Sequence, residues 1–114
     1  MEALANKALP IPSRVPVHGD TRVWAARSPL NLDSGASLHH YSLAYRTWGT
    51  LNSNANNAVL VVHALSGSAD LEAWWPDLLG EGKPLDPSRD FVICINLLGS
   101  CYGSSGPIAP RNDS

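Results

Sequence analysis

An unbroken apolar run, Ala58–Val62 (Ala-Val-Leu-Val-Val), constrains the fold of this chain more than any other stretch. It is rich in β-branched residues and lacks the apolar–polar alternation of a strand with one solvent-exposed face. We therefore expect a strand that is buried on both faces, inside a parallel sheet. The run ends at His63, and the small residues Ser66, Gly67 and Ser68 follow. In open α/β sheets ligands bind beyond the carboxyl ends of such strands, so this loop is the first candidate site.

A second apolar run, Phe91–Ile95, has the same character and closes at Asn96. We interpret it as a second buried strand. The connection over residues 63–90 is long enough to return the chain for a parallel pairing. It has room for a short helix within residues 69–79, whose length Pro76 limits. The sequence therefore predicts an α/β fold with parallel central strands.

The residues before the central run predict antiparallel structure. Residues 1–20 hold three prolines and show no periodicity, so we expect an irregular leader there. Short strands are expected over residues 21–25 and 30–32. Residues 37–48 alternate in part, which predicts a strand exposed on one side and paired as a hairpin with the segment before Gly35.

The length of the chain suits one domain, which we expect over residues 21–107, with an irregular tail over residues 108–114. Only 16% of residues are charged, the net charge is −2, and the basic residues are scattered. This argues against a nucleic-acid partner or an anionic membrane surface. No apolar run approaches the roughly 20 residues of a membrane span, and no secretory signal is evident. We therefore expect a cytoplasmic protein that does not associate with membranes.

The two cysteines, Cys94 and Cys101, suggest neither a disulfide framework nor a metal site. Residues 99–103 (Gly-Ser-Cys-Tyr-Gly) match the cysteine form of a nucleophile elbow, a motif that needs a helix directly after the nucleophile. Residues 104–107 (Ser-Ser-Gly-Pro) are a poor helix start, so a glycine-shaped loop with an incidental thiol is the favoured interpretation. The strict Gly-x-Ser-x-Gly motif does not occur in this sequence.

Histidines offer two further candidates. His63 is either a satisfied side chain packed under the loop or a general base, which would need a nucleophile and an orienting acid within reach. His39 and His40 would point to opposite faces of a strand and so form a poor metal site. A role in binding an oxyanion is easier to argue for the loop itself, because a turn directly after a central strand points backbone N–H groups into the crevice. Such donors can stabilise an oxyanion by about 3–4 kcal/mol each.

Four blocks in this order resemble a known family. They are residues 43–52 (Leu-Ala-Tyr-Arg-Thr-Trp-Gly-Thr-Leu-Asn), residues 57–67 (ending His-Ala-Leu-Ser-Gly), the pair Trp74-Trp75 and residues 96–107. Together they are similar to the N-terminal part of the homoserine O-acetyltransferases, the α/β-hydrolase-fold acyltransferases of methionine biosynthesis. The resemblance covers roughly residues 27–107. It implies the N-terminal portion of an α/β-hydrolase fold, with an incomplete sheet in this chain.

The resemblance implies ping-pong transfer of an acetyl group from acetyl-CoA, as co-substrate, to the hydroxyl of homoserine, with no bound cofactor or metal. The family uses a Ser-Asp-His triad that lies downstream of the matching segment. We therefore expect no nucleophile, acid or base in this chain and no activity from it alone. The backbone N–H of Leu65 matches an oxyanion-hole donor. Ser66, Gly67, Gly103 and Ser104 match segments that shape the substrate site, and a homodimer is possible for the full-length family.

Two alternatives stay open. Relatives of this family use succinyl-CoA or accept serine, so a fragment of a homoserine O-succinyltransferase or a serine O-acyltransferase fits the same residues. The chain could instead be a non-catalytic binding or assembly domain. A partial sheet with an apolar edge would then favour self-association, which argues against that last alternative.

Overall fold

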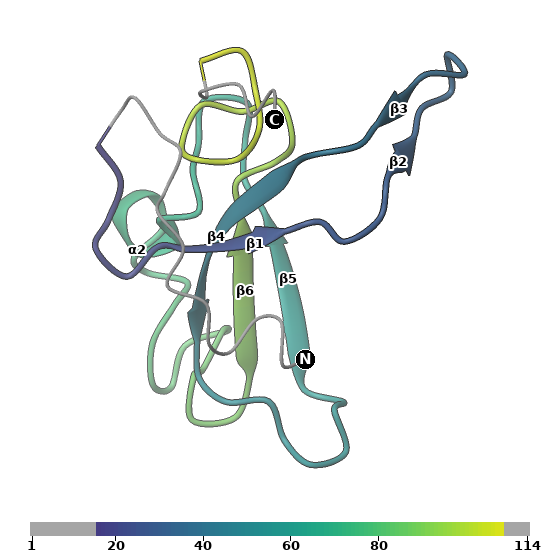
Figure 1. The fold of residues 1–114 in the computed structure, drawn as a ribbon. Coiled ribbons are helices and arrows are strands. Elements are labelled where there is room, and N and C mark those ends of the chain that lie inside the picture. Colours follow the sequence, from purple (N-terminus) through teal and green to yellow (C-terminus); the bar gives the residue numbers. More distant parts are fainter. Residues whose placement is uncertain (1–15, 109–114) are drawn as a thin grey trace.

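The structure is a computed structural model that describes residues 16–108 (Figure 1). Most of the predicted leader, residues 1–15, and residues 109–114 of the predicted tail lie outside the described residues. The main sheet has four strands in the spatial order β1 (Arg22–Ala25), β4 (Ser42–Trp48), β6 (Phe91–Ile95) and β5 (Ala58–Val62). A separate hairpin, β2 (Leu30–Asn31) with β3 (Ser37–Leu38), extends away from this sheet (Figure 1).

The two apolar runs form the parallel pair that the sequence predicts. β5 and β6 have the expected bounds, and their register places Ala58 opposite Phe91 and Val62 opposite Ile95. The crossover between them contains α2 (Leu71–Trp74), a single helical turn that ends before Pro76. The helix is shorter than the 69–79 window because proline supplies no N–H to continue it.

The expectation that β5 is buried on both faces is wrong. β5 lies at the edge of the sheet, and its residues alternate between half-buried and exposed, with Leu60 59% and Val62 61% exposed. Only one face of the strand is covered, because Val61 packs against the core around Leu71 whereas nothing in residues 16–108 covers the opposite face. Burial therefore depends on what packs against a strand as well as on its own composition.

The single strand expected over residues 37–48 is two strands. β3 pairs with β2 and confirms the predicted hairpin, but the chain bends between β3 and β4. The exposed His39 and His40 lie in this bend and not on a strand. β4 is also not exposed on one side, because residues that point to opposite faces, Ala44 and Tyr45, are both buried. It lies between β1 and β6 and pairs antiparallel with both. It is the most buried strand of the sheet.

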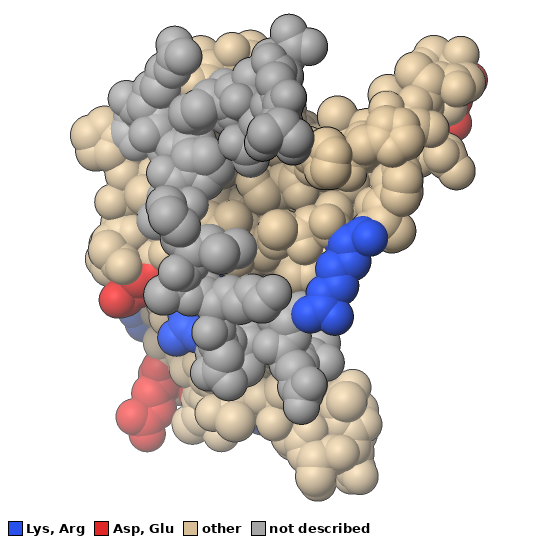
Figure 2. Space-filling view, in the orientation of Figure 1, with Lys and Arg blue, Asp and Glu red and all other residues tan. Residues whose placement is uncertain are grey.

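The core lies on the face of the sheet that α2 covers. Its centre is formed by Leu71, Leu79, Val92 and Cys94, with Trp48, Val61, Trp74 and Leu85 packed around it. Among residues 16–108, no helix reaches the length and apolarity of a bilayer-spanning segment. On the face drawn in Figure 2 the charged side chains of the described residues are scattered rather than gathered into one patch.

Candidate functional site

The loop after β5 begins with a tight turn, residues 64–67, which we call the oxyanion turn after the role that the resemblance implies for it. The N–H of Gly67 donates to the carbonyl of Ala64 at 2.8 Å, so Leu65 and Ser66 occupy the two central positions. The Leu65 side chain is fully exposed. Within the described part of the chain, no protein acceptor takes the N–H of Leu65 or of Ser66. Both N–H groups are therefore available to bind an anion.

His63 fixes the start of this turn. The N–H of Leu97 donates to its Nε2 at 3.0 Å, and its Nδ1 lies 2.7 Å from the carbonyl oxygen of Ala64. Since an amide N–H only donates and a carbonyl only accepts, the ring carries its proton on Nδ1 and uses its Nε2 lone pair for Leu97. The ring is buried and has no free lone pair for a substrate proton. The interpretation of His63 as a satisfied, packed histidine is confirmed.

Asn96 fixes the end of the same loop. Its Oδ1 accepts the N–H of Ala69 at 2.8 Å, and its Nδ2 donates to the carbonyls of Ala44 at 3.2 Å and Tyr102 at 3.0 Å. The residue is 1% exposed. One side chain therefore joins the loop after β5, the central strand β4 and the loop after β6.

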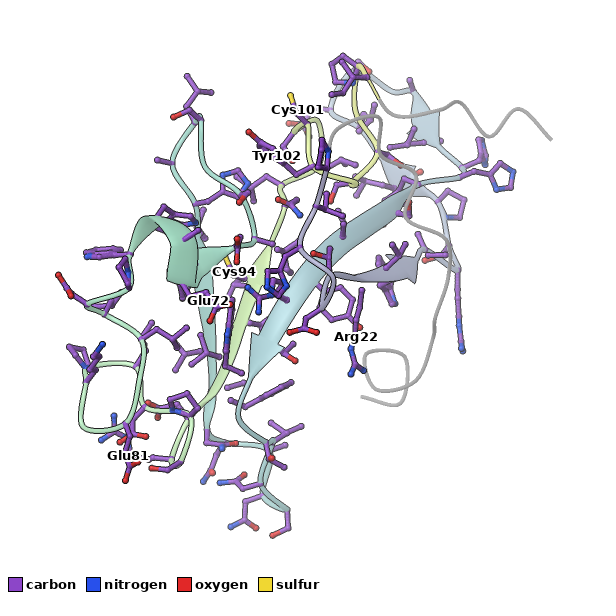
Figure 3. All side chains as sticks on the ribbon, turned by 90° about the vertical axis from the view of Figure 1, so that its left-hand side faces the viewer. Arg22, Glu72, Glu81, Cys94, Cys101 and Tyr102 are labelled. Atoms are coloured by element: carbon purple, nitrogen blue, oxygen red, sulfur yellow. The ribbon has the colours of Figure 1, made fainter. Side chains whose placement is uncertain are left out.

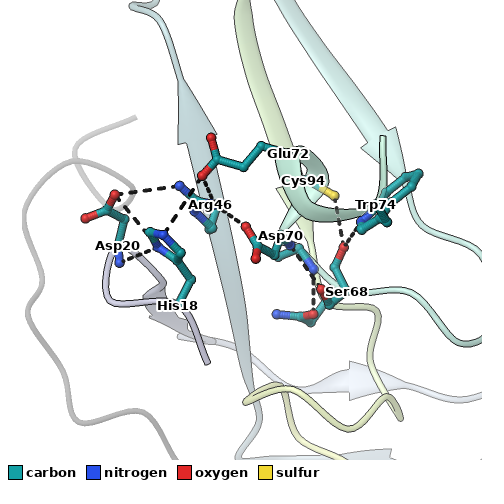
Figure 4. Close-up of polar contacts among 10 residues, drawn as sticks. His18, Asp20, Arg46, Ser68, Asp70, Glu72, Trp74 and Cys94 are labelled. Carbon is teal, nitrogen blue, oxygen red and sulfur yellow. Dashed lines mark hydrogen bonds and ion pairs between the residues drawn. The ribbon is translucent and has the colours of Figure 1, made fainter. Parts of the chain in front are cut away.

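A buried arginine on β4 holds the segment that follows. Arg46 donates from Nη1 to Asp70 and to Glu72, the latter at 2.7 Å, and its Nη2 lies 3.6 Å from Asp20 (Figure 4). Its guanidinium also lies 4.7 Å from the ring centre of Trp48. The hydrogen bond from Arg46 is the main cause that lowers the pKa of Glu72. These contacts tie the start of α2 to the centre of the sheet.

The loop of residues 97–106 is held against β4 by serine hydroxyls. Ser104 Oγ accepts the N–H of Ala44 at 2.8 Å and donates to the carbonyl of Asn96 at 2.5 Å, and this side chain is buried. Gly103 is buried beside it with a φ of 104°, a conformation that disfavours other residues. The roles of Ser104 and Gly103 in substrate binding, like those of Ser66 and Gly67 in the oxyanion turn, stay predictions.

The cysteines lie in different surroundings. Cys94 is buried in the sheet, and burial raises the pKa of its thiol to about 11. Cys101 is exposed in the loop beyond β6 (Figure 3), and no helix follows it in residues 102–108. The absence of that helix removes the nucleophile-elbow interpretation of residues 99–103. No group of three or more possible metal ligands occurs among residues 16–108.

A cavity of about 190 Å³ adjoins the oxyanion turn without including it. Its wall is formed by Pro16, Val17, His18 and Thr21 on one side, and by Ser68, Ala69, Asp70, Asn96 and Tyr102 on the other. Every polar atom of the Asn96 amide within this wall already has a protein partner. The cavity therefore borders the structural support of the turn and not its free N–H groups.

Sequence reasoning missed Arg46, Asp70 and the structural role of Asn96. A signal was present for Arg46, which is the only charged residue in an otherwise uncharged strand. A charge inside a buried strand indicates a buried partner, because an unpaired charge there is costly.

The fold and the turn beyond β5 define a class. The chain has part of an α/β-hydrolase fold: it superposes on an acetylester hydrolase from Corynebacterium glutamicum with a TM-score of 0.71 and 33% identity, covering 83% of this chain and 26% of that one. It also superposes on a homoserine O-acetyltransferase from Bacillus anthracis with a TM-score of 0.61 and 26% identity, over 68% of this chain and 23% of that one. No family model matches the sequence.

Curated relatives identify the group within that class. The homoserine O-acetyltransferase of Chlorobium luteolum is 50% identical over 92 residues, which are 81% of this chain and 26% of that protein. The enzyme of the same name from Chloroherpeton thalassium is 53% identical over 81 residues, 71% of this chain and 21% of that protein. The chain is thus a homologue of the homoserine O-acetyltransferases, which confirms the resemblance, and it spans about a quarter of their length.

Proposed function

We propose that this chain forms the oxyanion-turn portion of a homoserine O-acetyltransferase, which transfers an acetyl group from acetyl-CoA to the homoserine hydroxyl in methionine biosynthesis. The observation that carries the proposal is the pair of unengaged N–H groups at Leu65 and Ser66, directly beyond β5. The curated relatives supply the substrate class. We place the protein in the cytoplasm, as a homodimer when full length, with acetyl-CoA as a co-substrate and no bound cofactor.

In this mechanism a serine attacks the thioester carbonyl of acetyl-CoA, and the carbonyl oxygen becomes negatively charged. The Leu65 N–H donates to that oxygen, CoA leaves as its thiol, and the acetyl group stays on the serine as an ester. The homoserine hydroxyl then attacks this ester, and the same N–H stabilises the second oxyanion. The bond to the serine oxygen breaks, the serine regains a proton from the homoserine hydroxyl, and O-acetylhomoserine is released. Each such donor contributes about 3–4 kcal/mol to the transition state. The serine and its partners are supplied from outside the residues described here.

A second candidate is hydrolysis of acetyl esters, in which water takes the place of homoserine. It is favoured by the similarity to the acetylester hydrolase above and to the acetyl esterase MekB, the latter 33% identical with a TM-score of 0.67 over 78% of this chain and 25% of that one. The oxyanion turn would serve both reactions equally. Transfer to homoserine is preferred because the curated relatives named for it are about 50% identical.

The first experiment measures homoserine-dependent release of CoA by the purified chain, with CoA quantified chromatographically. We expect no turnover, because no histidine hydrogen-bonds to Ser104 or Cys101 among the described residues. Turnover that Cys101→Ala abolishes would overturn this expectation and make the chain an enzyme by itself.

The second experiment places residues 21–107 into the Chlorobium luteolum relative in place of its matching segment. We expect this chimera to acetylate homoserine, and Leu65→Pro to lower its kcat by about 10²–10³-fold, because proline removes the N–H but suits this turn position. Leu65→Ala is the matched control: it alters the same exposed side chain and keeps the N–H. Unchanged kcat in Leu65→Pro would refute the oxyanion role. Ester hydrolysis without transfer of an acetyl or succinyl group to homoserine or serine would favour the second candidate.

A further inference from the structure

The two residues at which β6 ends contact both flanks of the oxyanion turn. The Leu97 N–H donates to His63 before the turn, and the Asn96 side chain accepts the N–H of Ala69 after it. Between these two contacts, the Ala64 carbonyl accepts the N–H of Gly67 and lies 2.7 Å from His63 Nδ1. The Ser68 carbonyl accepts the Nε1–H of Trp74 at 2.8 Å and lies 3.7 Å from Cys94 Sγ. The strand β6 therefore supports both flanks of the turn, and the Trp74 side chain of α2 adds a contact at Ser68.

The Asn96 contact also reaches beyond the turn. Its Nδ2 donates to Ala44 on β4 and to Tyr102 in the next loop, and its own carbonyl accepts the Ser104 hydroxyl. Its backbone N–H donates to the same Ala44 carbonyl at 2.9 Å. The turn is thus connected to the most buried strand of the sheet through a residue that is itself almost fully buried.

We propose that Asn96 and the N–H of Leu97 form a two-point clamp that sets the position of the oxyanion turn, with Asn96 and His63 as positioning residues for acyl transfer. The geometry of the clamp follows from the contacts above, whereas its effect on catalysis rests on the proposed function. The polar atoms of both side chains are already bonded to protein groups, so we expect both residues to act through the turn and not on the reacting atoms. Their effect is to hold the Leu65 N–H where negative charge develops, and preorganised donors are effective only when they are held in place.

The chemistry of the clamp requires an amide at position 96. Asn96 accepts one N–H and donates to two carbonyls, whereas an aspartate of the same shape would place a carboxylate oxygen against those two carbonyl oxygens. Asn96→Asp should therefore rotate the side chain away and release Ala69. The substitution changes chemistry and leaves volume almost constant.

The chain contains a matched control at the opposite end of the sheet. Asn57 has the same bonding pattern: its Oδ1 accepts the N–H of Asn52 at 2.9 Å, and its Nδ2 donates to the carbonyls of Thr50 at 2.9 Å and Arg89 at 3.0 Å. It precedes β5, whereas the oxyanion turn follows it. Asn57→Asp repeats the chemical change without touching the clamp.

Amide hydrogen exchange followed by NMR on the labelled chain tests the geometry. In Asn96→Asp we expect the Ala69 amide to exchange at least about tenfold faster and the Leu65 amide resonance to shift, with Val92 and Cys94 in β6 still protected. Asn57→Asp should change neither amide. Unchanged Ala69 and Leu65 amides in Asn96→Asp, or the same changes in Asn57→Asp, would overturn the proposal.

His63→Ala removes the other point of the clamp and keeps the test decisive if Asn96→Asp does not fold. We expect the Leu65 and Gly67 amide resonances to shift in this variant while β6 stays protected. No change at these two amides in folded His63→Ala would contradict the clamp.

Kinetics in the chimera separates positioning from general stability. A turn that meets charge only in the transition state affects kcat and not KM, so Asn96→Asp should lower kcat by up to about 10²-fold at constant KM for homoserine. Asn57→Asp should leave both constants unchanged. An equal loss in both variants refutes the positioning role. A parent chimera without transferase activity refutes the proposed function, and the exchange experiment then still decides the clamp.

Discussion

Removing the carboxylate partners of Arg46 should lower the free energy of unfolding more than removing Arg46 itself. The Arg46 side chain is 4% exposed, whereas the side chains of Asp70 and Glu72 are 30% and 47% exposed. In Asp70→Asn/Glu72→Gln the guanidinium stays buried, and Asp20 at 3.6 Å is its nearest remaining carboxylate. Removing the close partners of a buried charge costs about 3–5 kcal/mol, and Asp20 offsets little of this because its side chain is 79% exposed. We therefore expect that loss in the free energy of unfolding of the double variant.

Removing the arginine instead of the carboxylates should lower the free energy of unfolding by less. In Arg46→Met the two carboxylates keep their access to water and are rehydrated, so the pairs that are lost are worth about as little as surface ion pairs, about 0.5 kcal/mol each. The contact with the Trp48 ring adds about 0.5–1 kcal/mol, and methionine fills most of the vacated volume. The sum predicts a loss of about 1–2 kcal/mol, clearly below that of the double variant.

Urea unfolding followed by tryptophan fluorescence measures both losses, since Trp48 lies against Arg46. Glu81→Gln, at an exposed carboxylate in the 80–83 turn, controls for the change in net charge and should shift stability by less than about 0.5 kcal/mol. A greater loss in Arg46→Met than in the double variant would refute the reasoning, because it would mean that the carboxylates, and not the guanidinium, carry the burial cost.

Three further results are expected. Iodoacetamide at about pH 8 should label Cys101 and spare Cys94, whose buried thiol has a pKa raised to about 11, and a native-state adduct on Cys94 in the mass spectrum would contradict this. Hydrogen bonds, the one from the Ser88 hydroxyl above all, lower the pKa of Asp86 to about 2. The stabilisation by this carboxylate is therefore present above about pH 4 and is lost as the pH falls towards 2. Asp86→Asn should flatten the dependence of the urea midpoint on pH in this range, and an unchanged dependence would exclude the effect. Leu60→Lys at the exposed edge should reduce self-association in light scattering, and equal association of both proteins would disprove edge pairing.

Much of the fold was predictable because the two apolar runs define their own limits. β5 and β6 begin and end where their apolar residues do, and the long crossover implied that they are parallel. The neighbours of β4 were not predictable in the same way. β4 is next to β6 although β5 lies between them in the sequence, and the partial alternation of residues 42–48 says nothing about such a rearranged strand order.

The position of the candidate site in the chain could be predicted from the sequence, but the contacts that support it could not. The loop after β5 was identified from the end of an apolar run, but its support comes from Asn96, and an asparagine after a strand has no chemical signature of its own. What determines that support is register. Val62 lies opposite Ile95, which brings His63 to the level where β6 ends and puts Leu97 within reach of its ring. A slip of one residue would turn the alternate side chains of β5 to the other face and remove the His63 contact together with the packing of Val61. The same register that buries one face of β5 therefore also positions the oxyanion turn, and a variant that shifts it should lose both at once.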